Sequence, residues 1–171
     1  STIVGVSICY QKDNCYFFPF KNKIKSILKT FFEDTEIKKI SFDVKNAIKH
    51  LLAHNIQFNG DFFDIQIAFH VLNPDMRNYF DFIVEKYLGI ILIEESSILG
   101  KGKTKHRFSE LDTKKTANFA CQRSEALFSL FNILKKELEN TKALDLFYKI
   151  EMPLLKVLAK MEQQGITIDT K

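Results

Sequence analysis

The sequence is poor in cysteine, and its few cysteines are scattered. Cys9, Cys15 and Cys121 form no Cys-x-x-Cys pair. This spacing excludes a disulfide framework and a zinc knuckle, so we expect reduced thiols. Long apolar runs are also missing: none approaches the ~20 residues that would cross a bilayer, and residues 1–8 lack the basic start of a secretory signal. We therefore expect a cytoplasmic protein with no membrane partner.

Tryptophan is absent, and only three prolines and six glycines interrupt the 171 residues. Hydrophobic residues make up 46% of the chain and include 17 phenylalanines, which is enough to bury the core of one domain. We expect the phenylalanines in this core rather than on an exposed stacking platform. The net charge of +4 and the pI near 8.8 fit a nucleic-acid partner and an ordinary soluble protein equally well.

The first part of the chain is predicted to mix strands and helices. Residues 3–8 and 15–20 are β-rich and flank a turn containing Asp-Asn, which indicates an antiparallel hairpin. Asp43 and Asp64 each precede an apolar pattern of helical spacing and are suited to cap a helix. The expected elements are helices at about residues 23–32, 44–54 and 64–72, a strand at 39–42 and a short extended segment at 56–63.

The second part is predicted to be mainly helical. Asn73-Pro74 ends one helix, and a helical pattern resumes over residues 78–88. We expect residues 89–107 to form a long, mobile connection, followed by a capping box at Ser109-x-x-Asp112. A long amphipathic helix through Leu138 comes next. A second helix at about residues 142–163, kinked near Pro153, is expected to pack against it.

A basic run follows the glycines near residue 100. Gly-Lys-Thr at residues 102–104 matches the end of a phosphate-binding loop, but that pattern requires a glycine where Ser97 stands. The nucleotide-loop interpretation therefore fails. The run could contact DNA phosphates through the candidate residues Lys101, Lys103, Lys105 and Arg107, but we favour an ordinary solvated loop, since such runs are usually surface.

His50 and His54 are four residues apart on one expected helix, a spacing that can place two imidazoles on one metal ion. A metal site needs further ligands, and no His-Glu-x-x-His pattern accompanies the pair. We interpret both as helix-end residues, where an imidazole faces unsatisfied carbonyl groups.

Residues 40–51 carry the most specific pattern, a short strand that leads into a helix with Ala47 on its inward stripe. The segment resembles the second exonuclease motif of bacterial DNA polymerase I, the family A polymerases, in which the Ala47 position holds a metal-binding aspartate. The resemblance is colinear along nearly the whole chain. Further matching blocks are residues 63–74, 100–103, 118–126 and 150–165.

Several positions depart from the family pattern. In the third exonuclease motif, Phe119 replaces a tyrosine and Arg123 replaces an aspartate four residues later. A guanidinium stays protonated at any relevant pH and would repel a divalent cation. The resemblance places the first motif, an acidic pair on the opening strand, just upstream of Ser1. We therefore expect no catalytic residue and no metal ligand at the degenerate motif positions Ala47, Phe119 and Arg123.

The resemblance implies an α/β fold of the ribonuclease H-like, DnaQ-like exonuclease type, a mixed sheet flanked by helices. In that fold the opening strand lies in the middle of the sheet, between the hairpin and the strand ending at Phe42. We expect upstream residues of the native protein to fill this position, or a dimer or strand swap to do so. The domain division expected is 1–143 for the exonuclease-like domain and 144–171 for a helix leading into a polymerase domain.

The resemblance implies a vestigial 3′–5′ exonuclease domain of a bacterial polymerase that replicates and repairs DNA near the nucleoid. Its partners would be DNA and its own polymerase domain, where Mg²⁺ is expected. We expect the emptied cleft to close over neighbours such as Phe119. The alternatives are an active exonuclease using the upstream strand with Asp43, Asp64 or Glu125, and a simple binding module. We interpret the two aspartates as helix caps and Glu125 as solvent-facing.

Overall fold

The computed structural model describes residues 3–102 and 105–165. Its first element is an antiparallel hairpin of β1 (Gly5–Gln11) and β2 (Asn14–Pro19), joined at Lys12 and Asp13. Asp13 has a φ of 64°, a left-handed conformation that aspartate tolerates better than most residues. The expected hairpin is confirmed.

A second pair of strands alternates with two helices. Helix α1 (Asn22–Glu33) leads to β3 (Lys39–Ser41), and α2 (Val44–Ala53) leads to β4 (Phe62–Asp64). Strands β3 and β4 pair in parallel, with Ile40 opposite Phe63. Only the last part of the extended segment expected at residues 56–63 is therefore a strand.

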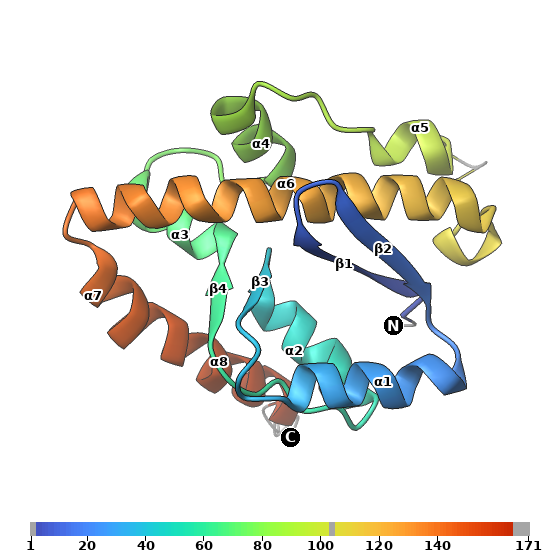
Figure 1. Cartoon of the computed structure of the whole chain (residues 1–171), viewed down its shortest axis with the longest axis horizontal. Helices are drawn as coiled ribbons and strands as arrows, with labels where there is room; N and C mark the ends of the chain where they lie inside the picture. The colour runs from blue at the N-terminus through green and yellow to red at the C-terminus, as the bar shows by residue number, and fades with distance from the viewer. Residues whose placement is uncertain (1–2, 103–104, 166–171) are drawn as a thin grey trace, which may run out of the picture.

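The strands form two separate sheets within the described part of the chain. One sheet holds β1 and β2, and the other holds β3 and β4. No hydrogen-bonded ladder joins β1 to β3 in these ranges. Figure 1 shows the two sheets beside each other below helix α6. The described strands therefore do not make one continuous sheet. This agrees with the resemblance, which places an opening strand between the hairpin and β3.

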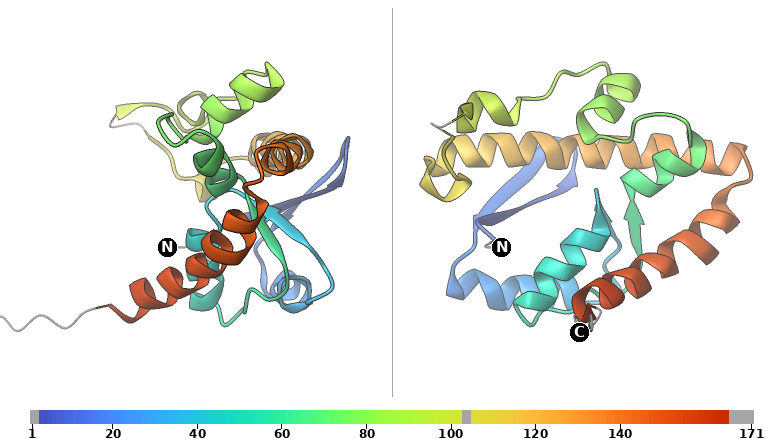
Figure 2. Two further views of the ribbon diagram at one scale, coloured as in Figure 1. Left: turned by 90° about the vertical axis from the view of Figure 1, so that its left-hand side faces the viewer. Right: turned by 180° about the vertical axis from the view of Figure 1, so that it is seen from behind.

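Helices dominate the rest of the chain. After α3 (Ile65–Leu72) and α4 (Phe80–Leu88) come α5 (Glu95–Leu99), a 3-10 turn (Phe108–Glu110) and the long α6 (Thr113–Asn140). Figures 1 and 2 show α6 between the hairpin on one side and α4 with α5 on the other. The described parts of the connection, residues 89–102 and 105–107, hold more regular structure than expected, because they contain α5 and bury Leu92 and Leu99.

The capping box expected at Ser109 is wrong. Ser109 lies inside the 3-10 turn, and Asp112, which precedes α6, makes no side-chain capping hydrogen bond. A contact of the capping-box type occurs two residues earlier in the chain. There the Glu110 carboxylate accepts from the Arg107 backbone N–H at 3.0 Å. A capping box at Ser109 would start a helix at Glu110. Helix α6 instead starts at Thr113, directly after Asp112, the last residue of the pattern.

The C-terminal helix breaks near Pro153, as the sequence predicted. The short α7 (Leu144–Leu146) passes through a π turn (Phe147–Glu151) into α8 (Met152–Gln164). Proline has no N–H to donate back along the helix, so a wide turn before Pro153 accommodates the missing bond.

The expected packing of the last helix is incorrect. Helix α8 packs chiefly against α2 instead of α6, and Figure 1 shows it leading away from α6. Glu162 forms ion pairs of 2.7 Å with both Lys45 and Lys49 of α2. The buried Leu155 and Ala159 lie on the same helix. An apolar stripe predicts that a helix packs, but it does not name the partner.

Aromatic rings join the elements at the centre of the core. The Phe63 ring of β4 lies with its centroid 5.0 Å from that of Phe131 on α6. It lies 4.7 Å from that of Phe147 in the π turn. Such edge-to-face and tilted contacts add to the burial energy of the rings. The expectation of a phenylalanine-rich core is confirmed.

Candidate active-site cleft

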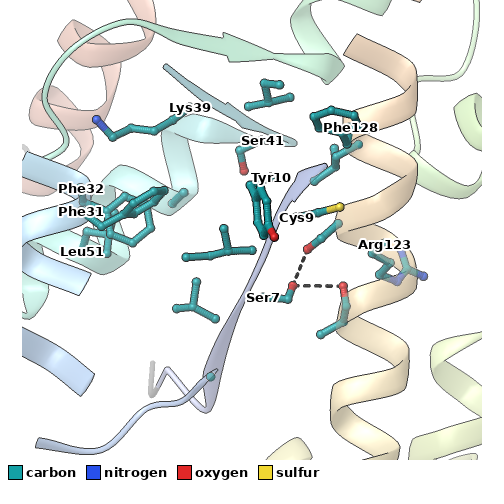
Figure 3. Close-up of a pocket in the computed structure, with 18 of the residues that line it drawn as sticks. Ser7, Cys9, Tyr10, Phe31, Phe32, Lys39, Ser41, Leu51, Arg123 and Phe128 are labelled. Atoms are coloured by element: carbon teal, nitrogen blue, oxygen red, sulfur yellow. Dashed lines mark hydrogen bonds between the residues drawn. The ribbon is translucent and has the colours of Figure 1, made fainter. Parts of the chain in front are cut away.

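A cavity of about 660 Å³ lies between the two sheets and is bordered by α1, α2 and α6. Figure 3 shows residues of these elements around it. Ala47 of α2 lines this cleft, and so do Phe119 and Arg123 of α6. The fold therefore brings Ala47 of α2 to the same cleft as Phe119 and Arg123, which lie four residues apart on α6 and far from Ala47 in the sequence. We expected the emptied cleft to close over Phe119, and this expectation is wrong because the cavity is open.

Two aspartates fix the start of the helix that carries Ala47. Asp43 adopts a left-handed conformation with φ 55°, and its carboxylate accepts from the Asn46 backbone N–H at 3.4 Å. The Asp64 carboxylate accepts from the Val44 backbone N–H at 2.7 Å. These contacts satisfy N–H groups that a helix leaves without partners in its first turn. Asp43 is therefore a helix cap, as the sequence predicted.

Asp64 also caps α3, which begins directly after it. Its other oxygen accepts from the backbone N–H groups of Gln66 at 2.8 Å and Ile67 at 3.3 Å. The residue is only 1% exposed. Burial raises the pKa of this carboxyl to about 6, although the three N–H donors act in the opposite direction. All of this places Asp64 in a structural role and confirms the predicted cap.

Arg123 lies at the wall of the cleft that faces α4. Its guanidinium makes two contacts with the Asp81 carboxylate, Nη1 to Oδ1 at 2.8 Å and Nη2 to Oδ2 at 3.3 Å. The guanidinium carbon lies 4.5 Å from the centroid of the Phe119 ring and 5.4 Å from that of Phe80. A planar guanidinium suits both kinds of contact. The side chain is thus held in place by a partner that sequence reasoning missed.

Strand β1 is attached to α6 next to the same cleft. The Ser7 hydroxyl donates to the Ala120 carbonyl at 3.0 Å, and it shares a second hydrogen bond of 2.5 Å with the Ser124 hydroxyl. Figure 3 shows both bonds. Residues separated by 113 and 117 positions meet here, and no local pattern marks them. The contact orients the α6 face that carries Arg123.

The donor set of the cleft does not suit a pair of catalytic metal ions. Its lining residues, as far as the structure describes them, include Cys9 and His50 but no aspartate or glutamate. The described ranges also contain no group of three or more His, Cys, Asp or Glu side chains placed to hold a metal ion. Two-metal phosphodiester hydrolysis needs several carboxylates that converge on the same point. The residues present therefore do not fit the metal site of an exonuclease.

The remaining candidate acid, Glu125, is directed at the hairpin. Its carboxylate accepts from the backbone N–H of Asp13 at 3.4 Å. The residue lies on α6 two positions beyond Arg123, and it is only partly exposed. Glu125 therefore contacts the hairpin turn, whereas the sequence predicted that it faces solvent.

The basic run near residue 100 carries its own acidic partners. The Lys105 ammonium pairs with the Glu95 carboxylate at 3.0 Å, and His106 lies 3.6 Å from Glu110. Lys101 and Arg107 are exposed, whereas Lys103 falls outside the described residues. Nearby acids lower the positive potential that DNA phosphates would meet.

His50 and His54 occupy the end of α2. His50 is in the last turn, and His54 is the C-terminal capping residue. The His54 ring packs against Phe20, with centroids 5.0 Å apart. The helix-end position predicted from the sequence is confirmed for both.

Comparison with known proteins agrees with this geometry. The family model described as "DNA polymerase I, ribonuclease H-like domain" matches residues 1–130. DNA polymerase I of Bacillus subtilis is 33% identical over 171 residues, which cover 98% of this chain and 19% of that protein. DNA polymerase I of Borreliella burgdorferi is 27% identical over 98% of this chain and 19% of its own length.

A solved structure has the same fold. It is the polymerase domain of Pol1 from M. smegmatis in complex with DNA primer-template and dNTP. It aligns with a TM-score of 0.74 and 20% sequence identity over 91% of this chain and 24% of that one. The fold and the cleft therefore define a ribonuclease H-like domain of the exonuclease type. The chain belongs to the DNA polymerase I family, as the resemblance indicated, and spans about a fifth of the length of the two relatives named above.

No helix within the described ranges is long and apolar enough to cross a membrane.

Proposed function

We propose that this domain has lost metal-dependent 3′–5′ hydrolysis and acts as a structural platform beside the polymerase domain of a DNA polymerase I. The observation that carries the proposal is the cleft lining, in which the described residues offer a methyl group at Ala47, a ring at Phe119 and a fixed cation at Arg123. A divalent ion in this cleft would meet a permanent positive charge and, among the lining residues that the structure describes, no carboxylate.

The platform role is supported by the outer face of the C-terminal helix. Ile150, Leu154, Val157 and Met161 are 57%, 43%, 52% and 62% exposed and are spaced three or four residues apart. An apolar stripe of this kind on the surface is typical of a contact with another domain. We assign residues 1–143 to the exonuclease-like domain. Residues 144–171 would lead into the polymerase domain.

The relatives named DNA polymerase I support the wider setting of the proposal. The whole protein would copy DNA in bacterial replication and repair, in the cytoplasm near the nucleoid, and Mg²⁺ would serve its polymerase domain. Synthesis would then proceed without proofreading from this domain.

The proposal is tested with a 3′-labelled single-stranded oligonucleotide, the full-length protein, and Mg²⁺ or Mn²⁺. We expect no EDTA-sensitive trimming of the oligonucleotide. Trimming that EDTA abolishes, and that the Asp43→Asn or Glu125→Gln variant reduces at least tenfold with unchanged circular dichroism, would overturn the proposal. Trimming that varies per milligram between preparations of the same protein belongs to a contaminating nuclease.

A gain-of-function variant sharpens the same test. Ala47→Asp, Phe119→Tyr and Arg123→Asp together restore the side chains that the family pattern holds at these positions. The matched control carries Ala47→Asn, Phe119→Tyr and Arg123→Asn, which changes the same sites without adding carboxylates. Mn²⁺ is expected to raise the melting temperature of the first variant, and to leave the control and the unmodified protein unchanged.

A further inference from the structure

The hairpin places two cysteines directly opposite each other. Cys9 of β1 faces Cys15 of β2, in a ladder that is regular from Gly5 to Cys9 and shifts only beyond Cys9. The Phe20 N–H donates to the Val4 carbonyl at 2.9 Å, so these two residues form a hydrogen-bonded pair. Hydrogen-bonded and non-hydrogen-bonded pairs alternate along an antiparallel ladder, and Cys9 lies an odd number of residues from Val4. Cys9 and Cys15 therefore form a non-hydrogen-bonded pair, the kind in which the side chains lie closer together.

This position in the ladder suits a covalent bond between the two sulfurs. The Cα atoms of a non-hydrogen-bonded pair are about 4.5 Å apart, and those of disulfides lie about 4.4–6.8 Å apart. Opposed residues also carry their side chains on the same face of a sheet. The backbones of β1 and β2 therefore hold Cys9 and Cys15 where a bond can form with little movement of the strands.

A third cysteine lies on the helix that this face contacts. The Ser7 hydroxyl donates to the Ala120 carbonyl of α6, and Cys9 is two residues further along β1, so its side chain points to the same face. Figure 3 shows the Cys9 sulfur on the α6 side of the strand. Cys121 follows Ala120 on α6. All three cysteines are free thiols.

The three thiols are close enough to affect one another's ionisation. Burial and the neighbouring Cys9 thiol raise the pKa of Cys15 to about 12. The Glu125 carboxylate and the Cys121 thiol act on the pKa of Cys15 in the same direction. Burial and Cys9 also raise the pKa of Cys121. Cys9 therefore lies near both of the other sulfurs, and we call the three cysteines, between the hairpin and α6, the thiol cluster.

The thiol cluster is accessible to a small oxidant. Each of its cysteines is partly exposed. Tyr10, which follows Cys9 in β1, is 62% exposed. The Cys9 thiol donates to the Gln11 carbonyl at 3.1 Å, but a thiol is a weak donor, so this contact offers little resistance to a reaction at the sulfur.

We propose that Cys9 and Cys15 are an oxidation site, at which hydrogen peroxide converts the two thiols into a cross-strand disulfide that thiol reductants reverse. One thiolate attacks the peroxide, so that an S–O bond forms, the O–O bond breaks and one water leaves. The sulfur of the opposite cysteine then displaces the hydroxyl group of this sulfenic acid, so that an S–S bond forms and a second water leaves. The two thiols together lose two electrons and two protons, which reduce the peroxide to water.

The ladder favours Cys15 over Cys121 as the partner of Cys9. Backbone hydrogen bonds fix the two strand positions relative to each other, whereas Cys121 belongs to a separate element. A sulfur with a raised pKa is also a poor leaving group, so a reductant releases Cys15 from the disulfide slowly. The disulfide therefore persists long enough to be isolated.

Peptide mass spectrometry of the full-length protein tests the proposal. The protein is treated with hydrogen peroxide, and the remaining thiols are blocked with an alkylating reagent. Trypsin cleaves after Lys12, Lys115 and Arg123, so the three cysteines fall in three different peptides. We expect the peptides of Cys9 and Cys15 to be joined, with a mass about 2 Da below the sum of the two reduced peptides, and dithiothreitol to separate them. Absence of this joined pair, or a main bond to Cys121, would overturn the proposal.

Cys121→Ser is the matched control for the other thiol of the cluster. It is expected to leave the yield of the joined pair unchanged, and loss of the pair in this variant would contradict a direct bond between Cys9 and Cys15. The rate of joining is expected to be independent of protein concentration, because both sulfurs belong to one molecule. A joined pair found only in covalent dimers would overturn the proposal. This inference does not depend on the loss of hydrolysis, because its measurements involve neither nuclease activity nor metal ions.

Discussion

The carboxylate of Asp64 holds the first backbone N–H of helix α2, that of Val44, at 2.7 Å. The same carboxylate caps α3, the helix that follows it in the chain. One buried side chain therefore sets the positions of two helices, and the helix that carries Ala47 is one of them.

Replacement of Asp64 by alanine is expected to lower the free energy of unfolding by about 3 kcal/mol, since three backbone N–H groups lose their acceptor. Urea denaturation followed by circular dichroism measures the change. Asp61→Ala is the matched control, because Asp61 is exposed and precedes the same strand. Equal losses in the two variants would rule out the double cap.

The pH dependence of stability should carry the signature of Asp64. Its pKa rises from 3.8 to about 6 on folding because the carboxyl is buried, so the folded state keeps a proton that the unfolded state has lost. The proton's stabilising contribution is complete below about pH 4 and is lost as pH rises through 6, a change of about 3 kcal/mol. The measurement is the difference in unfolding free energy between the native sequence and Asp64→Asn from pH 4 to 7. A difference that stays constant over this range would contradict the raised pKa.

The contact between Arg123 and Asp81 is expected to be worth about 0.5–1 kcal/mol, since both side chains are partly exposed. A double-mutant cycle with Arg123→Met and Asp81→Asn isolates this coupling from the packing of the arginine stem against Phe119. The coupling should shrink in 1 M salt. Zero coupling at low salt would mean that the two aromatic rings alone hold the guanidinium.

Phe63 is the strongest test of the core. Phe63→Ala removes a ring that joins β4, α6 and the π turn, so we expect a loss of about 3–5 kcal/mol in unfolding free energy. Phe82 of α4 is 36% exposed, and Phe82→Ala is expected to cost about 1 kcal/mol. Denaturant titration of the two variants gives the comparison, and similar losses would show that Phe63 is not central to the core.

Local chemistry made much of the fold predictable. The hairpin, the helix caps at Asp43 and Asp64 and the break near Pro153 each depend on residues close together in sequence. The capping box at Ser109 failed because a four-residue pattern does not decide between a 3-10 turn and an α-helix start. Residue spacing also could not show that α8 packs against α2.

The site was also predictable in part, but for a different reason. The positions of Ala47, Phe119 and Arg123 came from a resemblance, and the structure places all three on one cavity. The contacts that hold them were not foreseen. Asp81 lies 42 residues from Arg123, and Ser7 lies 113 residues from Ala120, so no local pattern could have revealed either pair.

The hydrogen bonds from Ser7 to α6 bear on how the protein folds during its synthesis. The hairpin is synthesised well before α6, and the helix that anchors it follows more than a hundred residues later, a delay on the order of ten seconds at typical elongation rates. An isolated two-stranded hairpin is barely stable in water. In the nascent chain, β1 and β2 therefore lack this support until α6 emerges, and they expose unpaired edges during that interval.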